Sequence, residues 1–136
     1  MTLTITLPGL PPVALRGNTW TMTTGQRWAR GCAAVDWGTT AHYAIVDARN
    51  RSERPDEWRD LDRISVLVTF VFKDNRRRDL DNLEGQAMKP IWDAMTRCNL
   101  ITDDRWQVVH PVAYDAEIDP KRGPLTIVEV TSETNQ

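Results

Sequence analysis

The tetrapeptide Arg-Asp-Leu-Asp occurs twice in this chain of 136 residues, and each copy places two carboxylates one residue apart. The copies end at Asp62 and at Asp81. In an extended backbone the two carboxylates point to one side, whereas on a helix they would lie about 200° apart. Paired carboxylates repel each other unless a proton or cation lies between them, and a hard cation such as Mg²⁺ prefers such oxygen ligands. Each copy is therefore a candidate metal site, and the sequence around each copy indicates which of the two is better placed to bind a metal ion.

The first copy lies in a charged connection with no clear period. Asp60 and Asp62 alternate there with Arg59 and Arg63, so solvated ion pairs satisfy these carboxylates at little gain in stability. The alternating residues from Ile64 to Lys73 that follow predict a strand. We interpret the first copy as a surface connection.

The second copy follows that strand and precedes an amphipathic helical pattern. The apolar residues of this pattern recur at four-residue steps, at Leu83, Ala87, Ile91 and Met95. Asp79 and Asp81 thus occupy a strand-to-helix junction, where their spacing can bring two carboxylates together. In the alternative interpretation Asp81 only caps the helix, a role worth about 1 kcal/mol, and Asp79 only pairs with a neighbouring arginine. Pro90 predicts that the helix is kinked or begins there.

A third acidic group follows this helix at Asp103 and Asp104. A return of the chain by one helix length would bring the turn beside the end of the preceding strand, and so beside Asp79 and Asp81. Neighbouring residues face opposite ways, so only one of the pair would join them. The alternative is an Asp-rich turn whose carboxylates bond to their own backbone.

The whole pattern predicts one domain over residues 1–136, of mixed α/β (α+β) class. We expect a mixed sheet of about four strands with two main helical segments, in the order β-α-β-α-β-β, ending in a hairpin. Strands are predicted at Thr2–Leu7, Ile64–Lys73, Trp106–Tyr114 and Leu125–Val130.

The first helical segment runs from Gln26 to Asn50. Its apolar residues recur at roughly helical spacing and are predicted to face the core, at Trp28, Cys32, Val35, Tyr43 and Val46. A bend is expected at 38–40, which gives one interrupted helix or two short ones. Trp92 and Trp106 are assigned to the core as well.

Composition limits the possible function classes. The net charge is −2, which argues against a general nucleic-acid coat and requires any DNA contact to come from a local patch. No apolar run is long enough to span a membrane. Cys32 and Cys98 are widely separated, so no zinc site or disulfide framework is predicted and a cytoplasmic location is expected.

The string RRRDLDNLEGQAMKPIWDAMTRCNLITDDRWQVV resembles the RusA-like endodeoxyribonucleases, a family that includes Holliday junction resolvases. The resemblance covers about the last two thirds of the chain in order of elements, and its specific part runs from Arg78 to Val108. The matching pieces are R-D-L-D-N, K-P-x-x-D-A-M and D-D before a strand, and their order is more specific than any single piece.

The resemblance implies an acidic cluster that binds Mg²⁺, with Mn²⁺ as a substitute ion, formed by Asp79, Asp81 and Asp104, with Asp103 as the alternate. The family's lysine follows the D-x-D-N stretch within about one turn, but Gly85 occupies that spacing here. Lys89 stands four residues later, on nearly the same face of a continuous helix or after a looped segment. Its alternative role is an i, i+4 pair with Asp93.

The most basic short stretch immediately precedes the acids and is a candidate contact for the phosphate backbone, at Lys73, Arg76, Arg77 and Arg78. The alternative is a solvated loop. The resemblance implies branched DNA as substrate. A four-way junction has two-fold symmetry, so a homodimer is expected.

The resemblance thus implies a Mg²⁺-dependent, structure-selective DNA endonuclease that resolves four-way junctions by paired symmetric nicks, in DNA recombination and repair and in a phage or prophage setting. A catalytically inactive junction-binding protein is the alternative, prompted by Gly85. A hydrolase of small phosphate esters is the third hypothesis, and a deep apolar pocket in the structure would support it.

Overall fold

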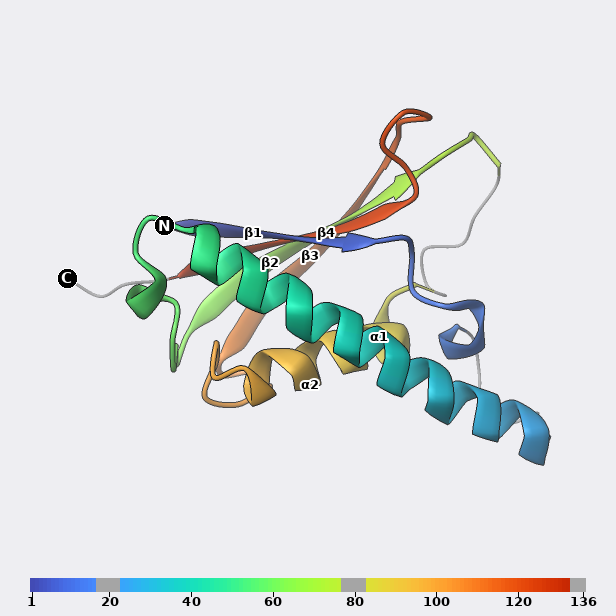
Figure 1. Cartoon of the computed structure of the whole chain (residues 1–136), viewed down its shortest axis with the longest axis horizontal. Coiled ribbons are helices and arrows are strands. Elements are labelled where there is room, and N and C mark those ends of the chain that lie inside the picture. Colours follow the sequence, from blue (N-terminus) through green and yellow to red (C-terminus); the bar gives the residue numbers. More distant parts are fainter. Residues whose placement is uncertain (17–22, 77–82, 133–136) are drawn as a thin grey trace.

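In the part of the chain that the structure describes, four strands and two helices form a single domain, as the sequence pattern predicts (Figure 1). The computed structural model describes residues 1–16, 23–76 and 83–132. The strands are β1 (Thr2–Pro8), β2 (Ile64–Phe72), β3 (Val109–Ile118) and β4 (Leu125–Ser132). The helices are α1 (Thr24–Arg51) and α2 (Lys89–Arg97), and short 3₁₀ turns are η1 (Val13–Leu15), η2 (Pro55–Glu57) and η4 (Gly85–Met88). The mixed class and the element order are confirmed.

The strands form one mixed sheet in the order β1-β4-β2-β3. β4 pairs antiparallel with β1 and β2, whereas β3 pairs parallel with β2. The predicted final hairpin is therefore wrong, because β2 lies between β3 and β4. The short link between those two strands passes the end of β2 so closely that a Cβ on Gly123 would lie 2.9 Å from the carbonyl carbon of Phe72.

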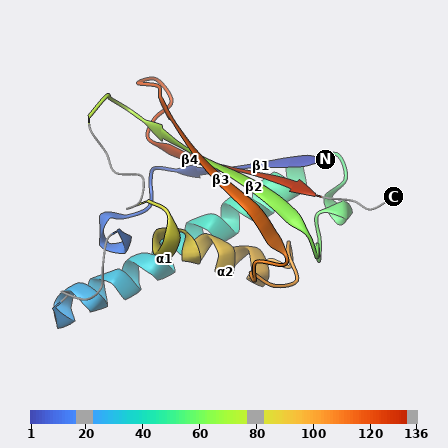
Figure 2. The same ribbon diagram turned by 180° about the vertical axis from the view of Figure 1, so that it is seen from behind.

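One face of β2 is the centre of the core. Its alternate side chains are all buried, at Ile64, Val66, Val68, Phe70 and Phe72. Both helices pack on this face of the sheet, and no helix of the described residues covers the opposite face (Figures 1 and 2). The predicted core face of this strand is confirmed.

α1 is continuous, so the predicted bend at 38–40 is wrong. A capping box starts the helix, because the Thr23 hydroxyl accepts from the Gln26 N–H and the Gln26 side chain accepts from the Thr23 N–H. Its buried face is a different stripe from the predicted one and consists of Trp37, Gly38, Ala41, Ile45 and Arg49.

The large apolar residues assigned to the core on α1 are mostly at the surface. Trp28, Val35 and Tyr43 are 74%, 68% and 69% exposed, and Trp106 is 69% exposed before β3. Small residues are buried on α1 because α2 crosses close to it. A Cβ on Gly38 would lie only 3.8 Å from the Cβ of Pro90. Where α2 crosses, α1 therefore buries the small residues Gly38 and Ala41, and the predicted set that includes Trp28 lies elsewhere on the helix.

α2 begins at Lys89, so Pro90 lies in its first turn, where the missing N–H costs little. The four residues before it form η4, which opens with Gly85 at φ 64°. The four-step pattern was correct as a core pattern, since its members Leu83, Ala87, Ile91 and Met95 are all buried. The four residues by which Lys89 is displaced from the position of the family's lysine thus correspond to a 3₁₀ turn, η4, ahead of α2.

A buried arginine joins the ends of the two helices. Arg49 is 5% exposed, and its Nη1 donates to the carbonyl oxygens of Cys98 at 2.7 Å and Trp58 at 3.4 Å. Burial, and then the nearby Arg59, lowers the pKa of Arg49. This contact fixes the relative position of α1 and α2 at their C-terminal ends. Neither helix of the described residues combines the length and hydrophobicity needed to span a bilayer.

Candidate functional site

The second Arg-Asp-Leu-Asp copy connects the end of β2 to the helical segment that begins with η4. Four of the predicted site residues lie outside the described residues, namely Arg77, Arg78, Asp79 and Asp81. The flanking elements agree with the predicted junction, because β2 ends at Phe72 and Leu83 is buried in the core ahead of η4.

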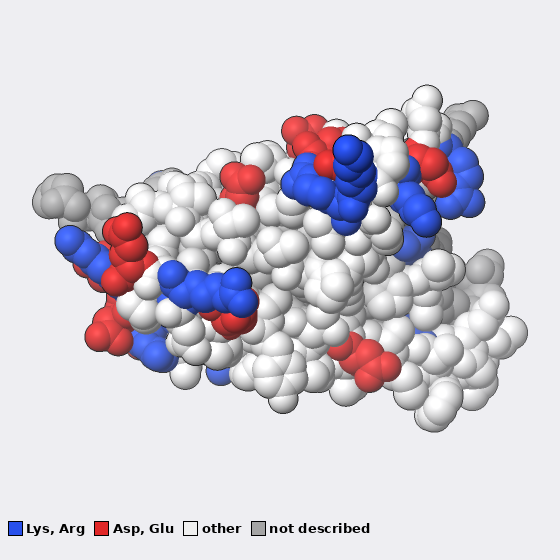
Figure 3. Space-filling model, turned by 45° about the horizontal axis from the view of Figure 1, so that its top comes forward, with Lys and Arg blue, Asp and Glu red and all other residues white. Residues whose placement is uncertain are grey.

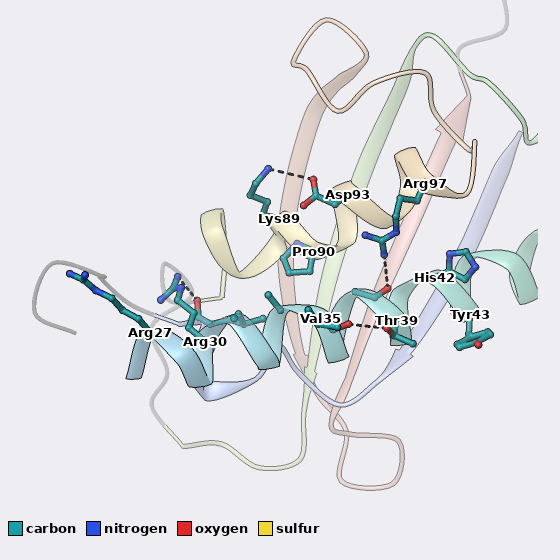
Figure 4. A pocket seen from close by; sticks show the side chains of 14 residues that line it. Arg27, Arg30, Val35, Thr39, His42, Tyr43, Lys89, Pro90, Asp93 and Arg97 are labelled. Carbon is teal, nitrogen blue, oxygen red and sulfur yellow. Dashed lines mark hydrogen bonds and ion pairs between the residues drawn. The ribbon is translucent and has the colours of Figure 1, made fainter. Parts of the chain in front are cut away.

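Lys89 is the first residue of α2 and its side chain is exposed (Figure 4). Its Nζ lies 3.4 Å from Oδ1 of Asp93. This is the i, i+4 pair given above as the alternative role, and such exposed pairs contribute a few tenths of a kcal/mol. A contact this weak leaves the ammonium able to exchange Asp93 for a phosphate.

Asp103 and Asp104 form the turn predicted by the alternative interpretation. The Asp104 N–H donates to Oδ1 of Asp103 at 2.7 Å, and Oδ2 of Asp103 lies 3.9 Å from Nε of Arg105. Asp104 itself is exposed. Of the two carboxylates, that of Asp103 is engaged within the turn, so Asp104 is the better candidate ligand.

This turn lies beside the beginning of β2, which corrects the expectation that it would lie beside the strand's end. Leu61 forms a parallel bridge with Ile101, and the Ile64 N–H donates to the Val108 carbonyl at 2.7 Å. The reason is that α2 runs back along the sheet, so a parallel β3 must start where β2 starts. Asp104 therefore follows the C-terminal end of α2, whereas Lys89 opens its N-terminal end.

The first Arg-Asp-Leu-Asp copy is an ordered surface connection, as predicted. Asp60 has φ 52°, and its N–H donates to the Asn99 carbonyl at 2.7 Å. Asp60 and Asp62 are both exposed. Within residues 1–16, 23–76 and 83–132, no three His, Cys, Asp or Glu side chains come together in a way that could hold a metal. The first copy therefore shows no third ligand among these residues, and the second copy lies outside them.

The loops that follow β2 and β3 lie together and form what we call the basic tip, made of Lys73, Arg76, Lys121 and Arg122. The Asp119 N–H donates to the Phe72 carbonyl at 2.9 Å, and Phe72 is paired in register with Ile118. Sequence reasoning found Lys73 and Arg76 but missed Lys121 and Arg122. The Asp-Pro-Lys-Arg-Gly-Pro turn was the available signal, and the parallel pairing of β2 with β3 brings it there.

Carboxylates neutralise much of the basic tip, and blue and red side chains are mixed there at the upper right of Figure 3. Arg122 pairs with Asp119 and with Glu117, and Arg76 pairs with Asp74. The hydrogen bond from Arg122 lowers the pKa of Asp119, and the same contact raises the pKa of Arg122. The tip can therefore contact phosphates but carries little excess charge.

A groove of about 770 Å³ is lined by residues of both α1 and α2 and is called the helix groove below. Its charged lining residues are Arg27 and Arg30 of α1 and Lys89, Asp93 and Arg97 of α2 (Figure 4). Sequence reasoning missed this surface because its residues lie far apart in the chain. Of its cations, only Lys89 belongs to a motif singled out above, and Arg27, Arg30 and Arg97 belong to none.

A cysteine and a histidine meet beside this groove. Sγ of Cys98 lies 3.1 Å from Nδ1 of His42. Burial raises the pKa of the Cys98 thiol, so the thiol is neutral near pH 7 and is a poor nucleophile. We interpret the pair as a packing contact between α1 and the end of α2.

Comparisons with family models and with curated proteins found no match to this chain. The assignment of function therefore depends on the motifs and on the fold.

Proposed function

We propose that this protein is a Mg²⁺-dependent endonuclease that cuts branched DNA, of the type that resolves four-way junctions. The observation that supports this most is the order of three motifs along one strand-helix-strand unit. Asp79 and Asp81 follow β2, Lys89 opens α2, and the Asp104 turn precedes β3. This order of motifs is the one implied by the resemblance to RusA-like endodeoxyribonucleases, whereas the fold places the Asp104 turn beside the beginning of β2.

The chemistry of the donor set agrees with this proposal. Carboxylate oxygens suit Mg²⁺, which can lower the pKa of a water molecule and offset charge on a phosphodiester. Lys89 is exposed and only weakly paired, so its ammonium could stabilise charge on the scissile phosphate. Lys73 and Arg76, with the undescribed Arg77 and Arg78, would position the phosphate backbone. Two free thiols, Cys32 and Cys98, agree with a reducing cytoplasm.

The substrate's symmetry supports a homodimer. Two opposed strands of a four-way junction must be cut, and a two-fold symmetric pair of subunits presents two equivalent sites. The DNA duplex arms would then lie across the basic tips of both subunits.

A second candidate function is an inactive junction-binding protein with the same fold. Two observations favour it: Gly85 stands where the family has its lysine, and Asp104 lies at the far end of α2 from Lys89. The helix groove is an open surface edged by cations, so it does not favour a small phosphate ester as substrate.

The test is cleavage of an end-labelled four-way DNA junction with Mg²⁺. The repeated motif offers a matched control, because Asp62→Asn makes the same change in the first copy. We expect paired symmetric nicks from the wild type and from Asp62→Asn. Asp81→Asn should bind the junction but nick it at least about 100-fold more slowly.

Binding without nicking by the wild type would support the inactive junction-binding protein instead. Absence of both binding and nicking would overturn both proposals. Equal losses in Asp62→Asn and Asp81→Asn would contradict the assignment of chemistry to the second copy.

A further inference from the structure

The helix groove combines an apolar floor with charged edges. Ala34 and Val35 of α1 and Pro90 of α2 line it, and Val35 is 68% exposed. Nη2 of Arg97 lies 3.5 Å from the Gly38 carbonyl, which holds this guanidinium over the floor (Figure 4). Nη2 of Arg30 donates to the Leu15 carbonyl at 3.0 Å. Both guanidiniums are thereby positioned along the groove by backbone carbonyls.

The charge of this groove is opposite to that of the whole chain. Among the described residues, four cations line it against one carboxylate, that of Asp93, whereas the chain has a net charge of −2. Arg27 and Arg97 belong to different helices and are both exposed. Because the cations outnumber the carboxylate and sit on two packed helices, they create a positive electrostatic potential in the groove, which favours binding of a polyanion.

An aromatic side chain follows along the same surface. Tyr43 lines the groove and is 69% exposed, so its ring is accessible for stacking. From Arg27 to Tyr43 the helix axis rises by about 24 Å. Cations along a track and an aromatic platform at its end are the features by which proteins hold single-stranded nucleic acid, with site sizes from about four nucleotides.

We propose that the helix groove binds a single-stranded segment of nucleic acid, with Arg27 and Arg97 contacting phosphates and Tyr43 stacking on a base. The exposed Tyr43 ring beside these cations suits a base that is not paired with another strand, so we take the bound segment to be single-stranded. The inference rests in part on the proposed function, because Lys89 lines both sites. Binding can nevertheless be measured without cleavage.

The test is the fluorescence anisotropy of a labelled oligothymidylate of about 12 nucleotides, in EDTA, at several salt concentrations. The groove variant is Arg27→Gln with Arg97→Gln. The matched control is Arg51→Gln with Arg54→Gln, which removes the same charge from two exposed arginines paired outside the groove.

We expect the groove variant to bind about tenfold or more weakly and to lose about 1.4 from the slope of log Kd against log salt, since each cation contributes about 0.7. The control should change the affinity less than about threefold. Tyr43→Ala should weaken binding about tenfold with little change in the slope.

Equal losses in the groove variant and the control would overturn the inference, because overall charge would then explain the binding. An unchanged groove variant would also overturn it. So would competition by polyglutamate at the same charge concentration, which would show that any polyanion fits. Junction nicking with unaltered oligothymidylate binding in the groove variant would reject this inference alone, whereas oligothymidylate binding without nicking would reject the nuclease alone.

Discussion

The described residues of the basic tip and of the helix groove include four cations each, but the groove keeps the larger excess of positive charge. The tip has Lys73, Arg76, Lys121 and Arg122 beside Asp74, Glu117 and Asp119. The groove has Arg27, Arg30, Lys89 and Arg97 beside Asp93. Among the described residues, the tip is therefore closer to neutral than the groove. At the tip, carboxylates two to five residues away in the sequence pair with the arginines and offset their charge.

The two regions also differ in how they are built. The tip consists of loops beyond the strand ends, whereas the groove lies between two helices that are joined at one end by the buried Arg49. Positions on packed helices are held more precisely than positions on loops. We therefore assign to the tip a general contact with phosphates and to the groove a positioned contact with a strand.

Two glycines give the largest expected difference between the regions. In Gly123→Ala the new Cβ would lie 2.9 Å from the Phe72 carbonyl carbon and 3.0 Å from two further backbone atoms, so the tip must shift. We expect a loss of about 1–3 kcal/mol in the free energy of unfolding. In Gly38→Ala the nearest atom would be Nη2 of Arg97 at 3.5 Å, which is ordinary contact.

Gly38→Ala should therefore be neutral or should stabilise α1 by up to about 1 kcal/mol, since alanine is favoured over glycine inside a helix. Urea denaturation of both variants measures the difference. A loss in Gly38→Ala as large as that in Gly123→Ala would contradict the proposed spacing of the helices along the groove.

A smaller effect tests the neutrality of the tip. Arg122→Gln removes the hydrogen bond that lowers the pKa of Asp119, so this pKa should rise toward its ordinary value of 3.8. A carboxyl with a lowered pKa adds stability above its ordinary pKa and loses it as the pH falls through the lowered value. The stability difference between wild type and variant should thus be present above about pH 4 and fade in stronger acid.

A carboxyl-carbon NMR titration of Asp119 measures this directly. Because both side chains are exposed, salt should reduce the difference. An unchanged Asp119 pKa in Arg122→Gln would show that Asp119 does not neutralise Arg122. The tip and the groove would then not differ in how far their cations are neutralised.

Local periodicity was sufficient to predict most of the fold. The alternation in β1, β2 and β4 fixed the strands and the core face, and the four-step pattern ending at Met95 fixed the buried face before and within α2. The α1 face was wrong because its sequence contains two stripes. Its larger apolar side chains, such as Trp28, predicted that their face is buried. The close approach of α2 instead buries the face that contains Gly38 and Ala41.

Long-range pairing accounts for the remaining differences. The link between β3 and β4 is short enough for a hairpin, but each strand pairs with a different side of β2. The same parallel pairing places the Asp104 turn beside the start of β2 and brings Arg122 to its end. A motif within one segment, such as Asp79 and Asp81, is visible in a sequence, whereas a groove between two helices is not.

The central claim is that the second Arg-Asp-Leu-Asp copy, not the first, holds the metal ion. The most direct measurement replaces Mg²⁺ by Fe²⁺, generates hydroxyl radicals at the bound iron with ascorbate and peroxide, and maps the cut peptide bonds by mass spectrometry. The account predicts cuts beside Asp79 and Asp81 that excess Mg²⁺ suppresses and that Asp81→Asn abolishes. Cuts centred on Asp60 and Asp62, or no cuts that Mg²⁺ can suppress, would contradict it.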